Sequence, residues 1–191
     1  MKVILPKTYI PEVDITYPLF FLAGPVNGGN DWQCGATNSI QKKVNEFFVA
    51  IPHEYKEGHP LHIHRMVNRA PDFFKRQLPW ERHYIKLAAG ITYEMDIHVK
   101  CGCLIFWLPA ESECQPRNDG LPYAMDTRRE VGEALGWLRS DPSLRIVIGA
   151  EKNFPGIDTI QRCFTEELGK FIFHESLEET IGAGLQIALG Q

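Results

Sequence analysis

Five short apolar runs, separated by longer segments with helical patterning, constrain the fold of this chain more than any other feature. They are LFFLA (19–23), VAI (49–51), CLIFWLP (103–109), LRIVIGA (144–150) and KFIFH (170–174). Apolar runs of this length that lack polar alternation predict strands buried on both faces. Because such strands alternate here with helical segments, we expect an α/β fold in which helices cover both faces of a parallel sheet.

The segments between the runs support this pattern. Residues 32–48 place apolar side chains at helical spacing, and residues 176–189 begin with Ser176 and Glu179 in the spacing of a capping box, which starts a helix. The 191 residues contain no repeat, low-complexity tract or linker. We therefore expect one domain that spans residues 1–191.

Composition and charge exclude several classes of function. The formal net charge of −4 argues against a broad electrostatic surface for polymeric nucleic acid. No apolar run approaches the roughly 20 residues that cross a membrane, and Pro6 and Lys7 interrupt the N-terminal stretch before it reaches signal-peptide length. Five cysteines without a CxxC pair fit a reducing compartment. We expect a cytoplasmic protein that has no membrane partner.

The predicted fold indicates where a ligand binds. In open parallel sheets, ligands bind beyond the carboxyl ends of the strands, near the point where the strand order reverses. Two polar segments follow predicted strands in this way: GPVNGGNDW at 24–32 and AESECQPRNDGLPYAMDTRREVG at 110–132. The second segment ends in a helical pattern that contains Glu130.

Glu130 has two interpretations. Thr127 and Glu130 have the T-x-x-E spacing of a capping box, in which the glutamate satisfies backbone N–H groups at the start of a helix. Alternatively, the helix dipole and the neighbouring Arg128 and Arg129 keep the carboxylate ionised at the ligand-binding edge, where it acts as a nucleophile. Spacing alone does not decide between them.

Four segments in this order resemble the nucleoside 2-deoxyribosyltransferase-like family: FFLAGPV (20–26), DW (31–32), YEMDIHVKCGCLIFWLP (93–109) and TRREVGEALGW (127–137). The resemblance spans residues 19–150. It implies a flavodoxin-like (Rossmann-like) open sheet of about five parallel strands. It also implies cleavage of the bond between deoxyribose and its base through a covalent glycosyl intermediate on a glutamate. Glu130 matches the position of that nucleophile.

The departing base must receive a proton, so a second carboxyl group is expected. Family members carry an acidic residue on the helix that leads into the third strand. An alignment without gaps places Glu94 there as the second catalytic residue. Glu81, in QLPWERHY, is the rival, because Trp-Glu also occurs in that family helix, and it is counted among the substrate-binding candidates. For either residue the alternative is a solvated helix face.

Five further residues are candidates for substrate binding. Gly24 lets the backbone approach the substrate, or is an ordinary turn glycine. Asp31 and Trp32 hold the ligand or stack on it, or they are an N-cap and a packed aromatic. Asp126 binds a sugar hydroxyl or orients Glu130, or it caps the helix. Arg128 contacts the substrate, or pairs with an acid.

The segment 52–80 departs from the family pattern by its length, and its function stays open. A connection of this length is often functional, for example as a lid. It carries His53, His59, His62 and His64, but no Cys or His pair has zinc-finger spacing. We therefore expect neither a metal nor a cofactor.

Three functions follow from these features. The first is transfer of deoxyribose between bases, with a small-molecule nucleoside or nucleotide and a free base as substrates. The second is an N-glycoside hydrolase that acts on a nucleoside, a nucleotide or NAD. The third is a non-catalytic nucleotide-binding module, since a fold does not determine a function. The resemblance also implies a homo-oligomer.

Overall fold

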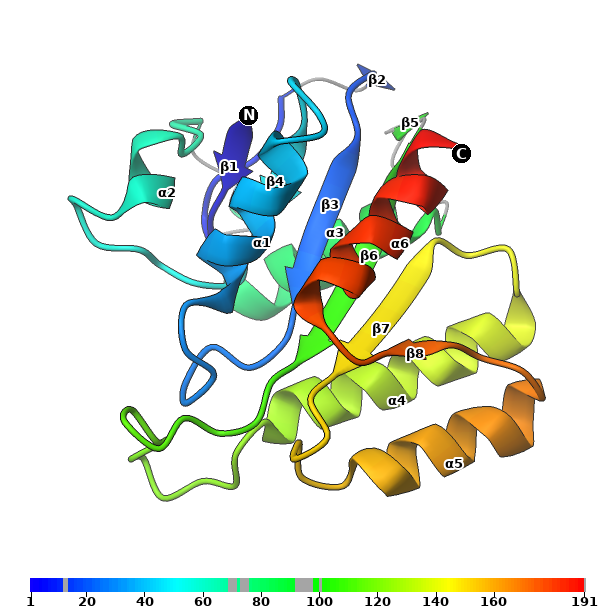
Figure 1. The fold of residues 1–191 in the computed structure, drawn as a ribbon. Helices are drawn as coiled ribbons and strands as arrows, with labels where there is room; N and C mark the ends of the chain where they lie inside the picture. The colour runs from blue at the N-terminus through cyan, green and yellow to red at the C-terminus, as the bar shows by residue number, and fades with distance from the viewer. Residues whose placement is uncertain (12–13, 69–71, 73–75, 92–97, 100, 191) are drawn as a thin grey trace.

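A six-stranded, all-parallel sheet forms the centre of the computed structural model, which describes residues 1–11, 14–68, 72, 76–91, 98–99 and 101–190 (Figure 1). Its strands, in spatial order, are β1 (Lys2–Ile4), β4 (Phe48–Ala50), β3 (Leu19–Ala23), β6 (Gly102–Leu108), β7 (Ile146–Ala150) and β8 (Phe173–His174). A separate pair of short parallel strands joins β2 (Asp14–Ile15) to β5 (His98–Val99).

The strand order is that of a flavodoxin-like fold. Without β1, the spatial order is β4-β3-β6-β7-β8, which corresponds to 2-1-3-4-5 along the chain. The five strands predicted from the apolar runs are therefore confirmed. The sixth strand, β1, was not predicted, because a run of three residues beside a proline carries little strand signal. It extends the sheet by pairing with β4.

Helices cover both faces of the sheet (Figure 1). One face is covered by α1 (Trp32–Gln41) and α6 (Leu177–Leu189), and the other by α3 (Gln77–Ala89), α4 (Met125–Ser140) and α5 (Ile157–Leu168). A short helix, α2 (Pro60–Ile63), lies beside the edge that carries β1. No helix in the described ranges is both long enough and apolar enough to cross a membrane.

Alternating side chains of the central strands supply two separate cores. Phe20 and Ile105 pack toward α1 and α6, whereas Phe21 and Phe106 pack toward α3 and α4. Every residue of β3 and β6 is buried, as expected for strands covered on both faces. This double coverage leaves the carboxyl ends of the strands as the accessible part of the sheet.

The helix predicted over residues 32–48 is shorter in the structure than its apolar spacing indicates. Apolar spacing continues to residue 48, but α1 ends at Gln41, because the chain must turn back there to enter β4. The C-terminal helix begins as predicted: the Ser176 hydroxyl accepts a hydrogen bond from the Glu179 backbone N–H at 3.2 Å.

The close contact between β7 and α6 depends on a glycine. A Cβ at Gly149 would lie 1.9 Å from Thr180 Oγ1 and 3.0 Å from Thr180 Cβ, so the helix would have to shift. We predict that Gly149→Ala lowers the free energy of unfolding by about 1–3 kcal/mol, measured by chemical denaturation.

Gly182→Ala is the matched control, because no atom lies within 4 Å of its added Cβ and the residue is within the same helix, α6. This variant should gain up to about 1 kcal/mol from higher helix propensity. Equal stability of the Gly149 variant and the wild type would contradict the tight packing of α6 on β7.

Candidate functional site

Glu130 lies in the second turn of α4, and not at the start of the helix. The N-cap is Ala124, which adopts a left-handed conformation with φ 53° and makes no side-chain cap. The helix begins at Met125, so Thr127 already lies within its first turn, where it is buried. The capping-box interpretation of Thr127 and Glu130 is therefore wrong. The carboxylate of Glu130 is not required to satisfy the helix terminus.

A cavity of about 590 Å³ lies at the carboxyl ends of β3, β4 and β6, next to the point where the strand order reverses. Residues from the loops after these strands, from α3 and from α4 line it. They are Gly24, Pro25, Val26, Asn27, Pro52, His53, Glu54, Gln77, Leu78, Glu81, Arg117, Ala124, Asp126, Thr127, Arg129 and Glu130.

The Glu130 carboxyl group is largely withdrawn from solvent. Its side chain is 16% exposed, and its oxygen lies 3.6 Å from a guanidinium nitrogen of Arg129. Burial, reinforced by the Glu81 carboxylate, raises the pKa of Glu130 to about 8, although Arg129 opposes this shift. A carboxyl group that keeps its proton near neutral pH is typical of acid–base sites.

Glu81 reaches the same cavity from α3. The Gln77 side-chain amide donates a hydrogen bond of 2.8 Å to Glu81 Oε1, which holds the carboxyl group in place. Burial raises the pKa of Glu81 as well, and the Asp126 carboxylate adds to this shift. The negative charge of Glu81 disfavours ionisation of Glu130, so Glu130 keeps its proton to a higher pH than an isolated glutamate does.

The cavity is acidic, because its cations are already paired. The Arg117 guanidinium contacts both carboxylate oxygens of Asp119, at 2.6 and 2.9 Å. Arg129 donates to Glu133 and lies close to Glu130. Among the described residues, four carboxyl groups line the cavity, those of Glu54, Glu81, Asp126 and Glu130, against two guanidinium groups, although Glu54 is itself paired with Lys7 at 2.6 Å.

Gly24 and Trp32 have different positions relative to the cavity. Gly24 lines it, and a Cβ there would lie 2.2 Å from the Trp107 carbonyl oxygen and 2.7 Å from Trp32 Cζ2. Trp32 is buried in the core beneath this turn, where its indole N–H donates to the Pro25 carbonyl at 3.0 Å. The structure thus places Trp32 as a support for the Gly24–Pro25 turn, and not among the described residues of the cavity wall.

The other predicted site residues are dispersed. Asp126 lines the cavity from the first turn of α4, whereas Arg128 donates a hydrogen bond of 3.0 Å to the Tyr123 carbonyl and is not part of the described wall. Asp31 lies in a neighbouring cavity. Glu94 falls within residues 92–97, outside the described part of the chain, so its assignment stays a prediction.

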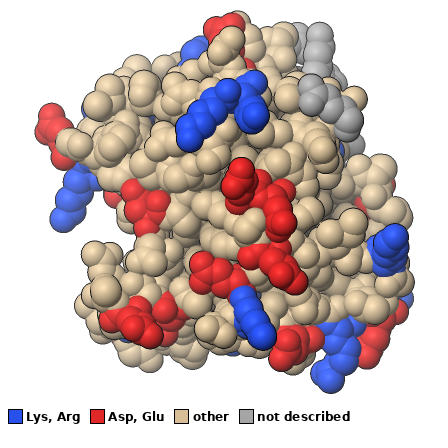
Figure 2. Space-filling view, viewed as in Figure 1, with Lys and Arg blue, Asp and Glu red and all other residues tan. Residues whose placement is uncertain are grey.

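The neighbouring cavity, of about 500 Å³, shares Val26, His53 and Glu54 with the first one. Figure 2 shows a hollow at the left edge of the molecule, between the segment that leads into α2 and the loop after β6. Residues of both segments, such as Tyr55 and Gln115, line the second cavity.

His53 is the clearest cavity residue that sequence reasoning did not assign. It lies three residues beyond the end of β4, and its ring packs edge-on against Tyr55 with centroids 4.5 Å apart. Burial lowers the pKa of His53, so the ring is neutral near neutral pH. The same rule that pointed to the ends of the first and third predicted strands would have found His53 at the end of the second.

In comparisons with known proteins, no protein-family model matches this chain, and no curated protein matches it significantly.

The raised pKa of Glu130 makes the stability of the protein depend on pH. The folded protein holds this proton up to about pH 8, whereas an unfolded glutamate loses it near 4.5. The free energy of unfolding therefore falls as the pH rises through this window. We predict that Glu130→Gln, which does not titrate, exceeds the wild type in stability at pH 8–9 by on the order of 2 kcal/mol.

Denaturation in urea at pH 5 and pH 9 tests this prediction. The gain should be small at pH 5, where both proteins are uncharged at this position. Glu166→Gln, at an exposed position on α5, serves as the matched control and should show no pH-dependent gain. An identical pH dependence for Glu130→Gln and the wild type would contradict the burial of a protonated carboxyl group.

Proposed function

We propose that this chain is a nucleoside deoxyribosyltransferase, in which Glu130 forms a covalent bond to the sugar of a deoxynucleoside and a second base then accepts the sugar. The observation that carries the proposal is the pair of half-buried carboxyl groups, Glu130 and Glu81, which line one cavity at the carboxyl edge of the sheet and whose pKa values are both raised. The resemblance in sequence to deoxyribosyltransferases, which places Glu130 at the position of the nucleophile, also supports it.

The chemistry requires two carboxyl groups with different protonation. Cleavage of an N-glycosidic bond sends the bonding electron pair to the base nitrogen and leaves positive charge on the sugar. An ionised carboxylate stabilises this charge and then bonds to the anomeric carbon, as in retaining glycosidases. A protonated carboxyl group gives its proton to the departing base. A pair that holds one proton and one negative charge supplies both requirements.

We assign the roles of acid and nucleophile from a single proton that moves between the two carboxyl groups; it is called the shared proton below. On its own, Glu130 with a pKa of about 8 is mostly protonated at neutral pH. Glu81, on α3, takes the proton when the substrate binds and passes it to the base. Glu130 is then ionised and attacks the sugar. In the second half-reaction the incoming base gives up a proton to Glu81 and displaces Glu130 from the anomeric carbon.

The charges of the cavity favour a nucleoside over a nucleotide. An unpaired cation would favour a 5'-phosphate, but Arg117 and Arg129, the guanidinium groups among the described wall residues, are both bound to carboxylates. Repulsion from Asp126 and from the ionised member of the Glu81–Glu130 pair would oppose a phosphate further. We therefore infer that the preferred donor is uncharged.

Base exchange tests the proposal. We predict that the wild type, incubated with deoxyadenosine and free hypoxanthine, forms deoxyinosine and adenine in equal amounts, which chromatography resolves. Glu130→Gln should lower the rate at least roughly 10³-fold, and Glu81→Gln about 10²- to 10³-fold, because one removes the nucleophile and the other the acid. Glu166→Gln should retain the wild-type rate.

The other outcomes separate the alternatives. Release of adenine and free deoxyribose without deoxyinosine would identify a hydrolase, in which water resolves the intermediate. Binding without release of a base would identify a non-catalytic module. If Glu94→Gln loses activity while Glu81→Gln retains it, Glu94 and not Glu81 supplies the proton.

The shared proton also predicts a bell-shaped dependence of rate on pH. Above about pH 8 the pair loses its last proton, so the departing base receives none and the rate falls. Below the raised pKa of Glu81 both carboxyl groups are protonated, so no nucleophile remains. Initial rates of base exchange between pH 4 and pH 10 measure both limbs. A rate that stays constant from pH 7 to pH 10 would contradict the proton-sharing pair.

A further inference from the structure

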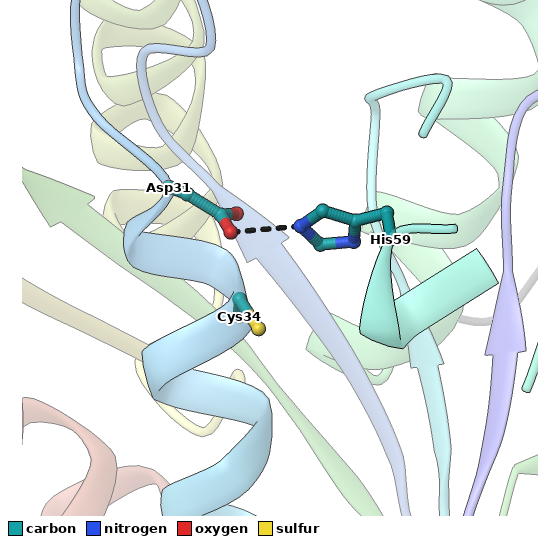
Figure 3. Close-up of side chains that lie close together, drawn as sticks. All are labelled: Asp31, Cys34 and His59. Carbon is teal, nitrogen blue, oxygen red and sulfur yellow. Dashed lines mark hydrogen bonds and ion pairs between the residues drawn. The ribbon is translucent and has the colours of Figure 1, made fainter. Parts of the chain in front are cut away.

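Asp31, Cys34 and His59 come together beside the second cavity, outside the carboxyl pair (Figure 3). Asp31 immediately precedes α1, Cys34 lies in its first turn, and His59 immediately precedes α2. One potential ligand atom from each side chain lies within 4.8 Å of the other two. The closest of these contacts joins His59 Nε2 to Asp31 Oδ2 at 2.9 Å.

We propose that these three side chains bind a divalent cation of the zinc type. A thiolate, an imidazole and a carboxylate together are characteristic of zinc, whereas magnesium and calcium prefer oxygen ligands alone. Around a tetrahedral zinc ion, ligand atoms lie about 3.3–3.8 Å apart, given metal–ligand distances of about 2.0–2.3 Å. The three ligand atoms must therefore shift to surround an ion, and the His59 ring must give up the hydrogen bond that it accepts from the Leu61 N–H.

The three side chains are accessible to solvent, and Tyr55 holds two of them in place. The side chains of Asp31 and His59 are 47% and 23% exposed, so an ion reaches them from solvent. The Tyr55 hydroxyl donates to Asp31 Oδ1 at 3.0 Å, and the Tyr55 ring stacks on His59 with centroids 3.9 Å apart. Such contacts orient metal ligands. Because Asp31 and His59 also line the second cavity, a fourth position is available there for water.

Metal binding changes the protonation of two ligands. His59 Nδ1 accepts a hydrogen bond from the Leu61 N–H at 3.2 Å, so the proton of the neutral ring is on Nε2, directed at Asp31. Coordination through Nε2 moves that proton to Nδ1 and breaks the bond to Leu61. The Cys34 thiol releases its proton to solvent as the sulfur–zinc bond forms. One proton is therefore released for each ion bound.

The ligand spacing explains why the sequence did not indicate this site. Asp31 and Cys34 are three residues apart across the start of one helix, and His59 follows 25 positions after Cys34. This spacing matches no zinc-finger pattern. An ion here would connect the start of α1 to the segment that leads into α2. It would thus stabilise the wall of the second cavity, which shares His53 and Glu54 with the cavity that contains Glu130.

Titration of the untagged, reduced and chelator-treated protein tests the proposal. We predict that zinc chloride binds with one ion per chain in calorimetry. Cobalt(II) should produce the near-ultraviolet absorption band of a cobalt–thiolate bond. Cys34→Ser should abolish this band, and Cys34→Ser and His59→Ala should each weaken zinc binding at least about 10- to 100-fold.

Two controls and two outcomes make the test decisive. Cys163→Ser, on the distant helix α5, and His62→Ala, in the same histidine-containing segment, should bind zinc as the wild type does. The proposal is overturned if the wild type shows no binding at about 100 µM zinc. It is also overturned if Cys34→Ser binds as tightly as the wild type, which would assign the ion to other histidines. The cobalt band of the wild type needs no variant, so misfolding of a variant cannot mask the result.

Discussion

Coverage of the parallel sheet on both faces is the constraint on which the rest of this structure depends. Phe20 and Ile105 enter one core while Phe21 and Phe106 enter the other, so neither face of the central strands is left for a ligand. Because all strands are parallel, their carboxyl ends meet at one edge. The loops and helix starts that follow β3, β4 and β6 therefore converge there, and both cavities lie among these segments.

The two carboxyl groups of the acidic cavity lower the free energy of unfolding at high pH. Glu130 and Glu81 come from helices that pack on the same face of the sheet, and burial raises the pKa of both carboxyl groups. A carboxyl pair of this kind weakens the fold wherever both groups are ionised. Its retention in a cavity is characteristic of functional sites, where strained electrostatics are compensated by packing elsewhere. Here that packing is the double core around β3 and β6.

The sequence located residues at the cavity where a local pattern and the fold indicate the same position. Gly24 and Asp126 were assigned from their place after predicted strands, and both line the cavity with Glu130. It failed for Thr127, because the left-handed Ala124 begins α4 earlier than the capping pattern indicates. It also placed Trp32 in the site, although this side chain is buried under the Gly24 turn. His53 was missed because its strand is short and its histidine-containing segment fits no motif.

The sequence by itself determined five of the six strands of the main sheet, their burial on both faces and the edge of the sheet at which the cavities lie, since these follow from apolar runs that alternate with helical segments. Only the tertiary structure decided which side chains share a cavity. Glu81 and Glu130 are 49 positions apart, and Asp31 and His59 are 28 apart. Contacts of this kind depend on how α3 and the segment before α2 pack against the sheet, which no local pattern encodes. Charge pairing is likewise a tertiary property: Arg117 and Arg129 are cations in the sequence, but their carboxylate partners leave the cavity acidic.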